Sequence, residues 1–327
     1  MLYTELASFA GGDRLLQAVD PNSHLRYIQF CNNNISPALG SVRLAKLRAE
    51  QISEAYSKLL LNGRRDGKEG GLSPKTVHRM HTMLKQALAQ ACSWRMISYN
   101  PAALVKPPKV PRKEMRTLDT NATAKMIEAA RGTPIFIPIL LGVLCGLRRG
   151  EICGLHWRSV DLDAGTLSVV ASAVKVGGDV HEKEPKSGRG RAVTLPPMLV
   201  TELRRHRLQQ SEWLLRIGVR LTDNHHVCTR EDGAPFYPSS LTRSFTQFMR
   251  QHGLPPVRLH DLRHSHATHL LAAGVHPKIA QERLGHSSIG ITLDTYSHVL
   301  PGMQEDAVAK VDAALRAAMN RQDTNRK

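Results

Sequence analysis

The stretch VRLHDLRHSHATHLLAAGV, residues 257–275, has apolar residues at the spacing of a helix that packs on a core. Between positions 260 and 269 it also carries four histidines and Arg263. His260 and Arg263 are three residues apart and are therefore neighbours on one helix face. Burying two groups that can both be cationic is costly unless an anion lies beside them. A phosphate fits this requirement, because the guanidinium fork matches two phosphate oxygens.

The other three histidines of this stretch are better explained as structural residues with hydrogen-bond partners. At about 100° per residue, His264 points away from His266 and His269, so the three cannot converge on one metal ion. The chain has no HExxH motif and no paired cysteine and histidine spacing of a zinc site. We therefore expect no metal and no other cofactor.

The chain as a whole is strongly basic. Its 327 residues carry a formal net charge of +17, and its pI is about 10.0. A protein this basic usually binds a polyanion, most commonly nucleic acid, although a merely solvated basic surface is the alternative. A membrane partner is not expected, because no basic amphipathic anchor occurs. The longest apolar run, residues 135–147, is too short to cross a bilayer and is typical of a buried helix.

Cysteine usage and the first residues indicate a cytoplasmic protein, and the net charge of +17 indicates that it associates with DNA. The five cysteines are odd in number and form no CxxC pair, which fits free thiols in a reducing compartment. The N-terminal residues lack the basic start and apolar core of a signal peptide.

The clearest boundary is the segment NPAALVKPPKVPRKEMRTLD, residues 100–119, with four prolines and five lysines or arginines. It cannot continue a helix and is typical of an extended linker whose charges follow a phosphate backbone. Before it, residues 41–61 and 72–97 have helical apolar spacing, and Ser73 is placed to cap the second helix. We expect an N-terminal extension (1–21), a helical DNA-binding domain (22–107), a basic linker (108–116), a catalytic domain (117–300) and a C-terminal helix or tail (301–327).

The second domain has helical patterns interrupted by short strands. Residues 118–131 and the run through Leu147 predict helices, and residues 161–172 predict a turn into a strand. A hairpin is expected with strands near 180–184 and 191–195, and helices follow Pro196. The fold class is therefore mainly α with a small antiparallel sheet (α+β), an all-α domain followed by a mixed one. The last helix has an apolar stripe that would dock elsewhere, including on another subunit: Met303, Ala307, Val311, Leu315 and Met319.

Three further stretches carry candidate chemistry. Arg148 and Glu151 are i,i+3 neighbours in CGLRRGEICGLHW, and Lys186 lies in the hairpin sequence EPKSGRG. LGHSSIGITLDTYSHV, residues 284–299, offers His286 and Tyr296. Taken singly, these are an ordinary ion pair, a solvated lysine and a packing tyrosine. A tyrosine phenol becomes a nucleophile only where cations or a base stabilise the phenolate.

Together, GLRRGE, PKSGRGRAVTLP, HDLRHSHATHLL and LGHSSIGITLDTYSHV resemble the tyrosine recombinase (phage integrase) family, in this order and at these separations. The resemblance covers about residues 115–300, and the preceding helices are similar to the core-binding domain of that family. It implies a site-specific recombinase that cuts and rejoins double-stranded DNA through a 3′-phosphotyrosine link, without metal or ATP. A type IB topoisomerase and a non-catalytic DNA-binding regulator are the alternatives.

The resemblance also implies catalytic roles at the phosphate for four residues. Tyr296 matches the nucleophile that attacks the scissile phosphate. Arg148 and Arg263 match the arginines that clamp its non-bridging oxygens. Lys186 matches the hairpin lysine that protonates the leaving 5′ oxygen as general acid.

The remaining motif positions have supporting roles. His286 would hydrogen-bond the phosphate, and His260 would help proton transfer to or from the tyrosine. Glu151 would orient the site by holding Arg148 or a nearby histidine. Three arginines fall outside the motif positions and are interpreted as ordinary DNA-backbone or surface charges: Arg149, Arg189 and Arg191.

The family resemblance finally implies an assembly. The two domains would close around duplex DNA as a clamp, and recombination between two duplexes implies a homotetramer, with accessory DNA-bending or directionality factors as further partners. Many phage integrases carry an extra N-terminal arm-binding domain, whereas residues 1–21 here show no strand-rich pattern. We expect either a simple two-domain recombinase or a chain whose start was lost from a longer ancestor.

Overall fold

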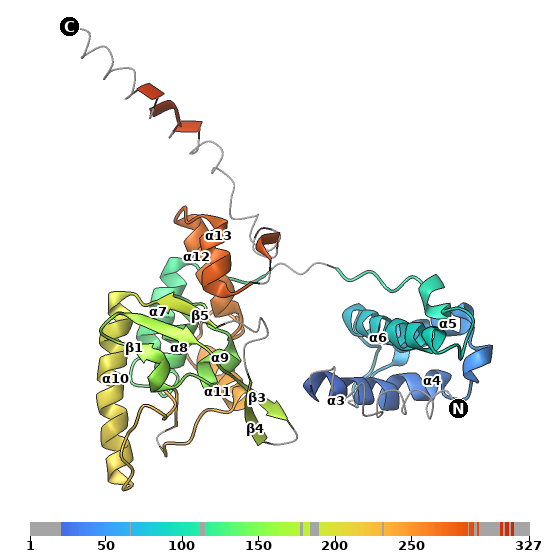
Figure 1. Ribbon diagram of the computed structural model, residues 1–327, viewed down its shortest axis with the longest axis horizontal. Helices are drawn as coiled ribbons and strands as arrows, with labels where there is room; N and C mark the ends of the chain where they lie inside the picture. The colour runs from blue at the N-terminus through green and yellow to red at the C-terminus, as the bar shows by residue number, and fades with distance from the viewer. Residues whose placement is uncertain are drawn as a thin grey trace. The chain divides into compact units, whose positions relative to one another are not determined.

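The computed structural model describes residues 21–65, 67–111, 115–176, 179–183, 190–230, 232–286 and 288–290, together with residues 293, 308–309, 311–313 and 315–316. The chain divides into two compact units, residues 1–114 and 115–327 (Figure 1). The division falls inside the basic segment for which the sequence predicts a linker.

The regular elements in the described part of the first unit are all helical. Its elements are α3 (Pro21–Phe30), the π-helical turn η1 (Cys31–Ile35), α4 (Ser36–Leu39), the 3₁₀ turn η2 (Leu44–Lys46), α5 (Ala49–Asn62), α6 (Pro74–Ser93) and the 3₁₀ turn η3 (Pro101–Leu104). Their apolar faces form one core. Residues 41–61, expected to be one helix, are divided at Arg48, whose backbone is extended and whose N–H donates to the Gln51 side chain at 2.9 Å.

Helix α6 shows how the sequence determines this unit. Ser73 caps it, its hydroxyl accepting from the backbone N–H of Thr76 at 3.2 Å, and Pro74 takes the first helical position. One face is buried in the core. The opposite face is exposed and basic, as the sequence predicts, with Lys75, His78, Arg79 and Lys85.

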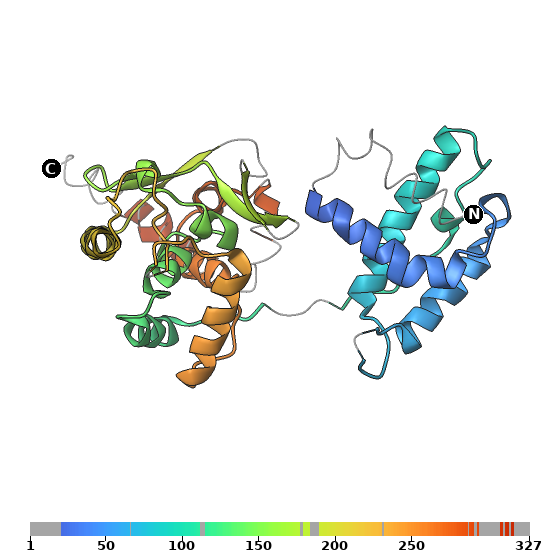
Figure 2. The ribbon, with the colours of Figure 1, turned by 90° about the horizontal axis from the view of Figure 1, so that it is seen from below.

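The second unit is built around a buried helix. Its helical elements are α7 (Thr120–Ala130), α8 (Phe136–Leu144), α9 (Arg149–Cys153), the 3₁₀ turn η4 (Trp157–Ser159), α10 (Pro197–Arg216), α11 (Pro238–Gln251), α12 (Asp261–Ala272) and α13 (Pro277–Leu284). Helix α8 corresponds to the apolar run of the sequence, and α7, α9, α10 and α12 pack against it. The long helix α10 is seen along its length in Figure 1 and end-on in Figure 2.

The strands pair differently from the expected hairpin. Strands β1 (Val160–Asp161), β2 (Thr166–Val169) and β5 (Arg191–Thr194) form an antiparallel sheet in the order β1-β2-β5, and β3 (Ser172–Val176) pairs with β4 (Asp179–Lys183). The predicted pairing of strands near 180–184 and 191–195 is therefore wrong. The sequence between β3 and β4 is Gly-Gly, the two-residue length and composition of a tight hairpin, so β4 pairs with the strand before it.

Two expectations concern the chain end and membranes. In the tail, the described residues Val308, Val311 and Leu315 are exposed, while Met303, Ala307 and Met319 of the predicted stripe lie outside the described residues. Among the helices that the structure describes, none is both long and apolar enough to span a bilayer.

Candidate active site

The C-terminal end of α13 is the centre of the candidate site. A helix end leaves backbone carbonyls without intrahelical partners, and the negative end of the helix dipole favours cations there. Three guanidinium groups occupy this end, each on a different carbonyl. Arg191 Nε donates to the carbonyl of residue 283 at 2.9 Å, Arg263 Nη2 to that of residue 284 at 2.5 Å, and Arg148 Nη2 to that of residue 285 at 2.8 Å.

Arg148 is positioned by the start of α9. It precedes the helix with an extended backbone, and Glu151 reaches back to it. The Glu151 carboxylate accepts from the Arg148 backbone N–H and from Arg148 Nη1, both at 2.8 Å. The contact that the i,i+3 spacing predicts is therefore present. The Arg148 side chain remains 40% exposed, so part of its guanidinium faces solvent.

Arg263 is buried and held at both ends of its guanidinium. Besides residue 284, it donates from Nη1 to the carbonyl of Gly146 at 2.6 Å. Gly146 lies in the turn between α8 and α9 with a left-handed backbone, φ 64°. Arg263 thereby joins the end of α13 to this turn, which lies 117 residues before Arg263 in the sequence.

Arg191 is the site residue that motif reasoning missed. Interpreted above as an ordinary DNA-backbone or surface charge, it instead donates Nη1 and Nη2 to the two Glu151 oxygens at 2.9 and 2.8 Å, with only 12% of its side chain exposed. Burial by itself would raise the pKa of Glu151, but the hydrogen bonds and charges of Arg191 and Arg148 lower it to about 2. No local signal reveals this pair, because the partners are 40 residues apart and on different elements.

His286 follows the three carbonyls directly. Gly285 ends α13 with a left-handed backbone, φ 64°, and the His286 carbonyl accepts from Gln281 Nε2 at 2.9 Å. Burial lowers the pKa of His286 to about 4, and the charges of Arg263 and Arg148 act in the same direction. These charges show that the surroundings of His286 favour an anion.

His260 and His264 lie beside each other. Their ring centroids are 5.0 Å apart with the rings nearly perpendicular. His260 precedes α12 as its N-cap instead of lying within the helix, and it reaches solvent although neighbouring groups remove part of the hydration of its ring. Loss of hydration and the charge of Arg263 lower the pKa of His260. Loss of hydration also lowers the pKa of His264, to about 4, and the neighbouring His260 acts in the same direction. His264, expected to be structural, therefore borders the candidate site.

The other two histidines of α12 have interior partners, as expected. His266 Nε2 accepts from Arg283 Nε at 3.1 Å, and burial lowers the pKa of His266 to about 3. His269 Nε2 lies 2.9 Å from the carbonyl of Leu118. Both rings help to anchor α12 to neighbouring segments.

The structure thus brings together Arg148, Glu151, Arg263 and His286, with His260 beside Arg263. The predicted catalytic residues Lys186 and Tyr296 lie outside the described residues, as does Arg189. Arg149 is exposed, as expected of a surface charge, and donates to the Thr242 hydroxyl at 2.9 Å.

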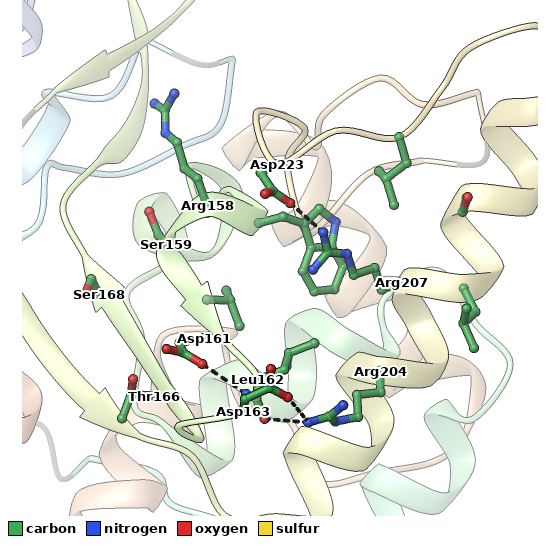
Figure 3. Close-up of a pocket in the computed structure, with 15 residues that line it drawn as sticks. Arg158, Ser159, Asp161, Leu162, Asp163, Thr166, Ser168, Arg204, Arg207 and Asp223 are labelled. Carbon is green, nitrogen blue, oxygen red and sulfur yellow. Dashed lines mark hydrogen bonds and ion pairs between the residues drawn. The ribbon is translucent and has the colours of Figure 1, made fainter.

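A broad pocket of about 910 Å³ lies elsewhere on the second unit, between the β1–β2 turn and α10 (Figure 3). Arg204 pairs there with Asp163, and Arg207 with Asp223. None of its lining residues belongs to the group around α13. Arg204 and Arg207 are thus paired with carboxylates, and Arg158 donates to the Asn224 side-chain oxygen at 2.9 Å.

Comparison with known proteins identifies the family. The model of the phage integrase family matches residues 113–302, more than half of the chain and all of the described site. The chain belongs to the phage integrase family. A tyrosine recombinase XerC-like protein of Caldanaerobacter subterraneus subsp. tengcongensis is 29% identical over 308 residues, 88% of this chain and 77% of that protein.

Two solved integrases have the same fold. The Tn1549 transposon integrase in complex with transposon right end DNA gives a TM-score of 0.76 at 20% identity, covering 93% of this chain and 98% of that one. A λ integrase tetramer bound to a Holliday junction gives a TM-score of 0.67 at 19% identity, covering 90% of this chain and 76% of that one. This phage integrase family member is a tyrosine recombinase, an enzyme of site-specific DNA strand exchange.

Proposed function

We propose that this recombinase cuts and rejoins double-stranded DNA through a 3′-phosphotyrosine intermediate, with Tyr296 as nucleophile and the end of α13 as the phosphate site. One observation carries the proposal. Arg263 and Arg148 are held on the adjacent carbonyls of residues 284 and 285, and His286 comes next in the chain. The three side chains therefore come together at the end of α13, within the family's matched region.

The arginines act by electrostatics. A phosphodiester under attack gains negative charge on its non-bridging oxygens, and preorganised cations stabilise that charge without reorganising during the reaction. Arg263 is fixed by two backbone carbonyls, and Arg148 by Glu151 and one carbonyl. His286 donates a further hydrogen bond to the phosphate. Glu151 and Arg191 position Arg148 and do not touch the substrate.

The proton transfers complete the step. The Tyr296 oxygen forms a bond to phosphorus, and the bond from phosphorus to the 5′ oxygen breaks. Lys186 gives its proton to the leaving 5′ oxygen, and the phenol proton passes to His260. The lowered pKa of His260 keeps this ring neutral near pH 7 and so able to accept a proton.

The relatives support a partner and an assembly for this chain. The chain binds double-stranded DNA, consistent with its net charge of +17 and with the DNA complex of the Tn1549 integrase. By analogy with the λ integrase tetramer on a Holliday junction, four copies act in the synaptic complex, aided by accessory DNA-bending or directionality factors. The similarity to a transposon integrase supports a role in the integration of a mobile element.

A nicked suicide substrate tests the nucleophile. The probe is duplex DNA from the ends of the element that carries the gene, nicked close to the cleavage position so that the cut strand is lost. The wild-type protein is expected to form an SDS-stable adduct with DNA, and Tyr296→Phe to form none while binding the same duplex. Tyr237→Phe is the control, because Tyr237 is an exposed tyrosine of the same unit.

Two outcomes would contradict the proposal. An adduct that persists in Tyr296→Phe would place the nucleophile on another residue. Relaxation of supercoiled DNA by the wild type with no strand exchange between two sites would favour a topoisomerase activity instead.

A further inference from the structure

We propose that His156, Glu182 and His226 form a binding site for a divalent cation of the zinc type in the second unit. Glu182 Oε1 lies 3.3 Å from His156 Nε2 and 3.0 Å from His226 Nε2. One ligand atom from each residue lies within 4.8 Å of the other two. The group shares no residue with the candidate active site.

The spacing suits tetrahedral coordination. Zinc binds imidazole nitrogen and carboxylate oxygen at about 2.0–2.2 Å, so neighbouring ligand atoms of a tetrahedron are about 3.3 Å apart. Both contacts to Glu182 Oε1 are close to this length. Two imidazoles and one carboxylate are also a ligand set that favours zinc over magnesium or calcium, which prefer oxygen ligands. Three protein ligands leave the fourth position to water.

The two histidines are held in place by the backbone. His156 and His226 face each other across an isolated antiparallel bridge, with ring centroids 4.1 Å apart. The bridge is fixed on both sides, as Trp157 N–H donates to the carbonyl of residue 225 at 3.1 Å and Val227 N–H to that of residue 155 at 2.7 Å. A metal site needs ligands already close together, and this bridge provides two of the three.

A buried side chain reinforces this arrangement. Gln210 of α10 donates from Nε2 to the His226 carbonyl at 2.9 Å and accepts from Trp157 Nε1 at 2.7 Å. Gln210 is 1% exposed, and Trp157 is also 1% exposed. Gln210 therefore ties the His226 backbone, and Trp157 next to His156, to the core, which leaves little freedom to the histidine backbones.

The third ligand comes from a different element. Glu182 belongs to β4, whereas the bridge joins the segment before η4 to the segment that follows α10. The Glu182 side chain is 36% exposed and that of His226 23%, so an ion from solvent can reach the group. A bound cation would link the β3–β4 hairpin to the core of the unit, and it would add to stability by binding the folded state alone.

Zinc binding to the full-length protein tests the site. The chain is stripped with a chelator and dialysed, and Zn²⁺ is titrated by calorimetry and native mass spectrometry, with Mg²⁺ as the comparison ion. We expect one equivalent of zinc to bind, a rise in Tm with zinc, and no comparable effect of Mg²⁺. Glu182→Gln and His226→Ala should each weaken zinc binding by at least about a hundredfold, more than the loss of an outer-shell partner.

His225→Asn is the matched control. His225 is the neighbour of His226 in sequence, but its Nδ1 lies 3.0 Å from the Thr222 backbone nitrogen and it is not one of the three ligands. It should bind zinc as the wild type does. Absence of one-equivalent binding in the folded wild type would overturn the proposal, as would equal zinc affinity in His225→Asn, Glu182→Gln and His226→Ala. Neither readout depends on DNA cleavage.

Discussion

At the scale of single residues, the most constrained side chain of the site is Glu151. It is 3% exposed, and its two oxygens are held by Arg191 and Arg148. A buried carboxylate is tolerated because both arginines are placed to pair with it. Glu151 in turn fixes the direction of Arg148, whose exposed guanidinium is the part of this group that can meet a phosphate.

Arg191→Ala should therefore damage both stability and catalysis. Removing one partner of a buried ion pair leaves charge without compensation, and we expect the free energy of unfolding to fall by about 3 kcal/mol. DNA cleavage should fall by more than binding does, because Arg148 loses part of its support. Urea unfolding and adduct formation measure the two effects.

The control is Arg204→Ala. Arg204 pairs with Asp163, but its side chain is 54% exposed, and exposed pairs contribute about 0–1 kcal/mol. Equal losses in Arg191→Ala and Arg204→Ala would mean that burial of the Arg191–Glu151 pair is unimportant.

The histidines of the site predict a pH dependence. Burial holds the pKa of His286 and of His264 at about 4, below the value of about 6.5 for an unfolded chain. Between pH 6.5 and 4 the unfolded chain therefore binds more protons, so stability should decrease as pH falls through this window. Protonation of Glu151 should lower stability further at more acidic pH. The stability that its ionised form contributes is lost as pH falls from about 4.5 towards its folded-state pKa of about 2.

Histidine NMR titration checks this expectation. The His286 ring, assigned by comparison with His286→Asn, should titrate near pH 4 in the DNA-free protein. Its midpoint should rise when DNA binds, because the phosphate offsets the charges of Arg263 and Arg148. A midpoint near 6.5 in the DNA-free protein would contradict the burial and the nearby cations.

At the scale of elements, the site depends on the turn between α8 and α9. Gly146 has a left-handed backbone, and a Cβ at this position would lie 2.7 Å from Leu284 and 2.8 Å from His266. Its carbonyl is one of the two that hold Arg263. The turn, α12 and α13 therefore share one contact region in which glycine is needed for both conformation and space.

Gly146→Ala should lower Tm and reduce cleavage together. Gly132→Ala is the control, since Gly132 also has a left-handed backbone, φ 74°, with nothing within 4 Å of its added Cβ. The control should show only the backbone strain of about 1–2 kcal/mol, with cleavage at wild-type level once folded. A Tm loss in Gly146→Ala no larger than in the control would show that the contacts to Leu284 and His266 relax without cost.

At the scale of the whole molecule, the described residues of each unit form a hydrophobic core of their own, and a smaller apolar cluster of the second unit joins α12 to α13. The first unit presents the basic face of α6, and the second carries the proposed phosphate site. Because each unit has its own core, we expect each to fold without the other.

Expression of residues 1–114 and 115–327 as separate chains tests this division. We expect each to be helical by circular dichroism and to unfold cooperatively. On the same DNA, the fragment 115–327 should show a shallower dependence of log K on log salt than the full chain, because it makes fewer phosphate contacts. Equal slopes would mean that the first unit contributes no phosphate contacts.

The sequence by itself determined the helical patterns, the cap at Ser73, the buried helix α8 and the motif residues of the family. These signals act over a few residues, through periodicity, capping and excess charge. The tertiary structure decided the rest, since the carbonyl that Arg148 reaches is 137 residues away, and Arg191 and Glu151 are 40 apart. The tertiary structure likewise decided that β4 pairs with β3. It also brings together His156, Glu182 and His226 from separate segments. Such contacts depend on how α8, α12, α13 and the strands pack, and no spacing within one element encodes them.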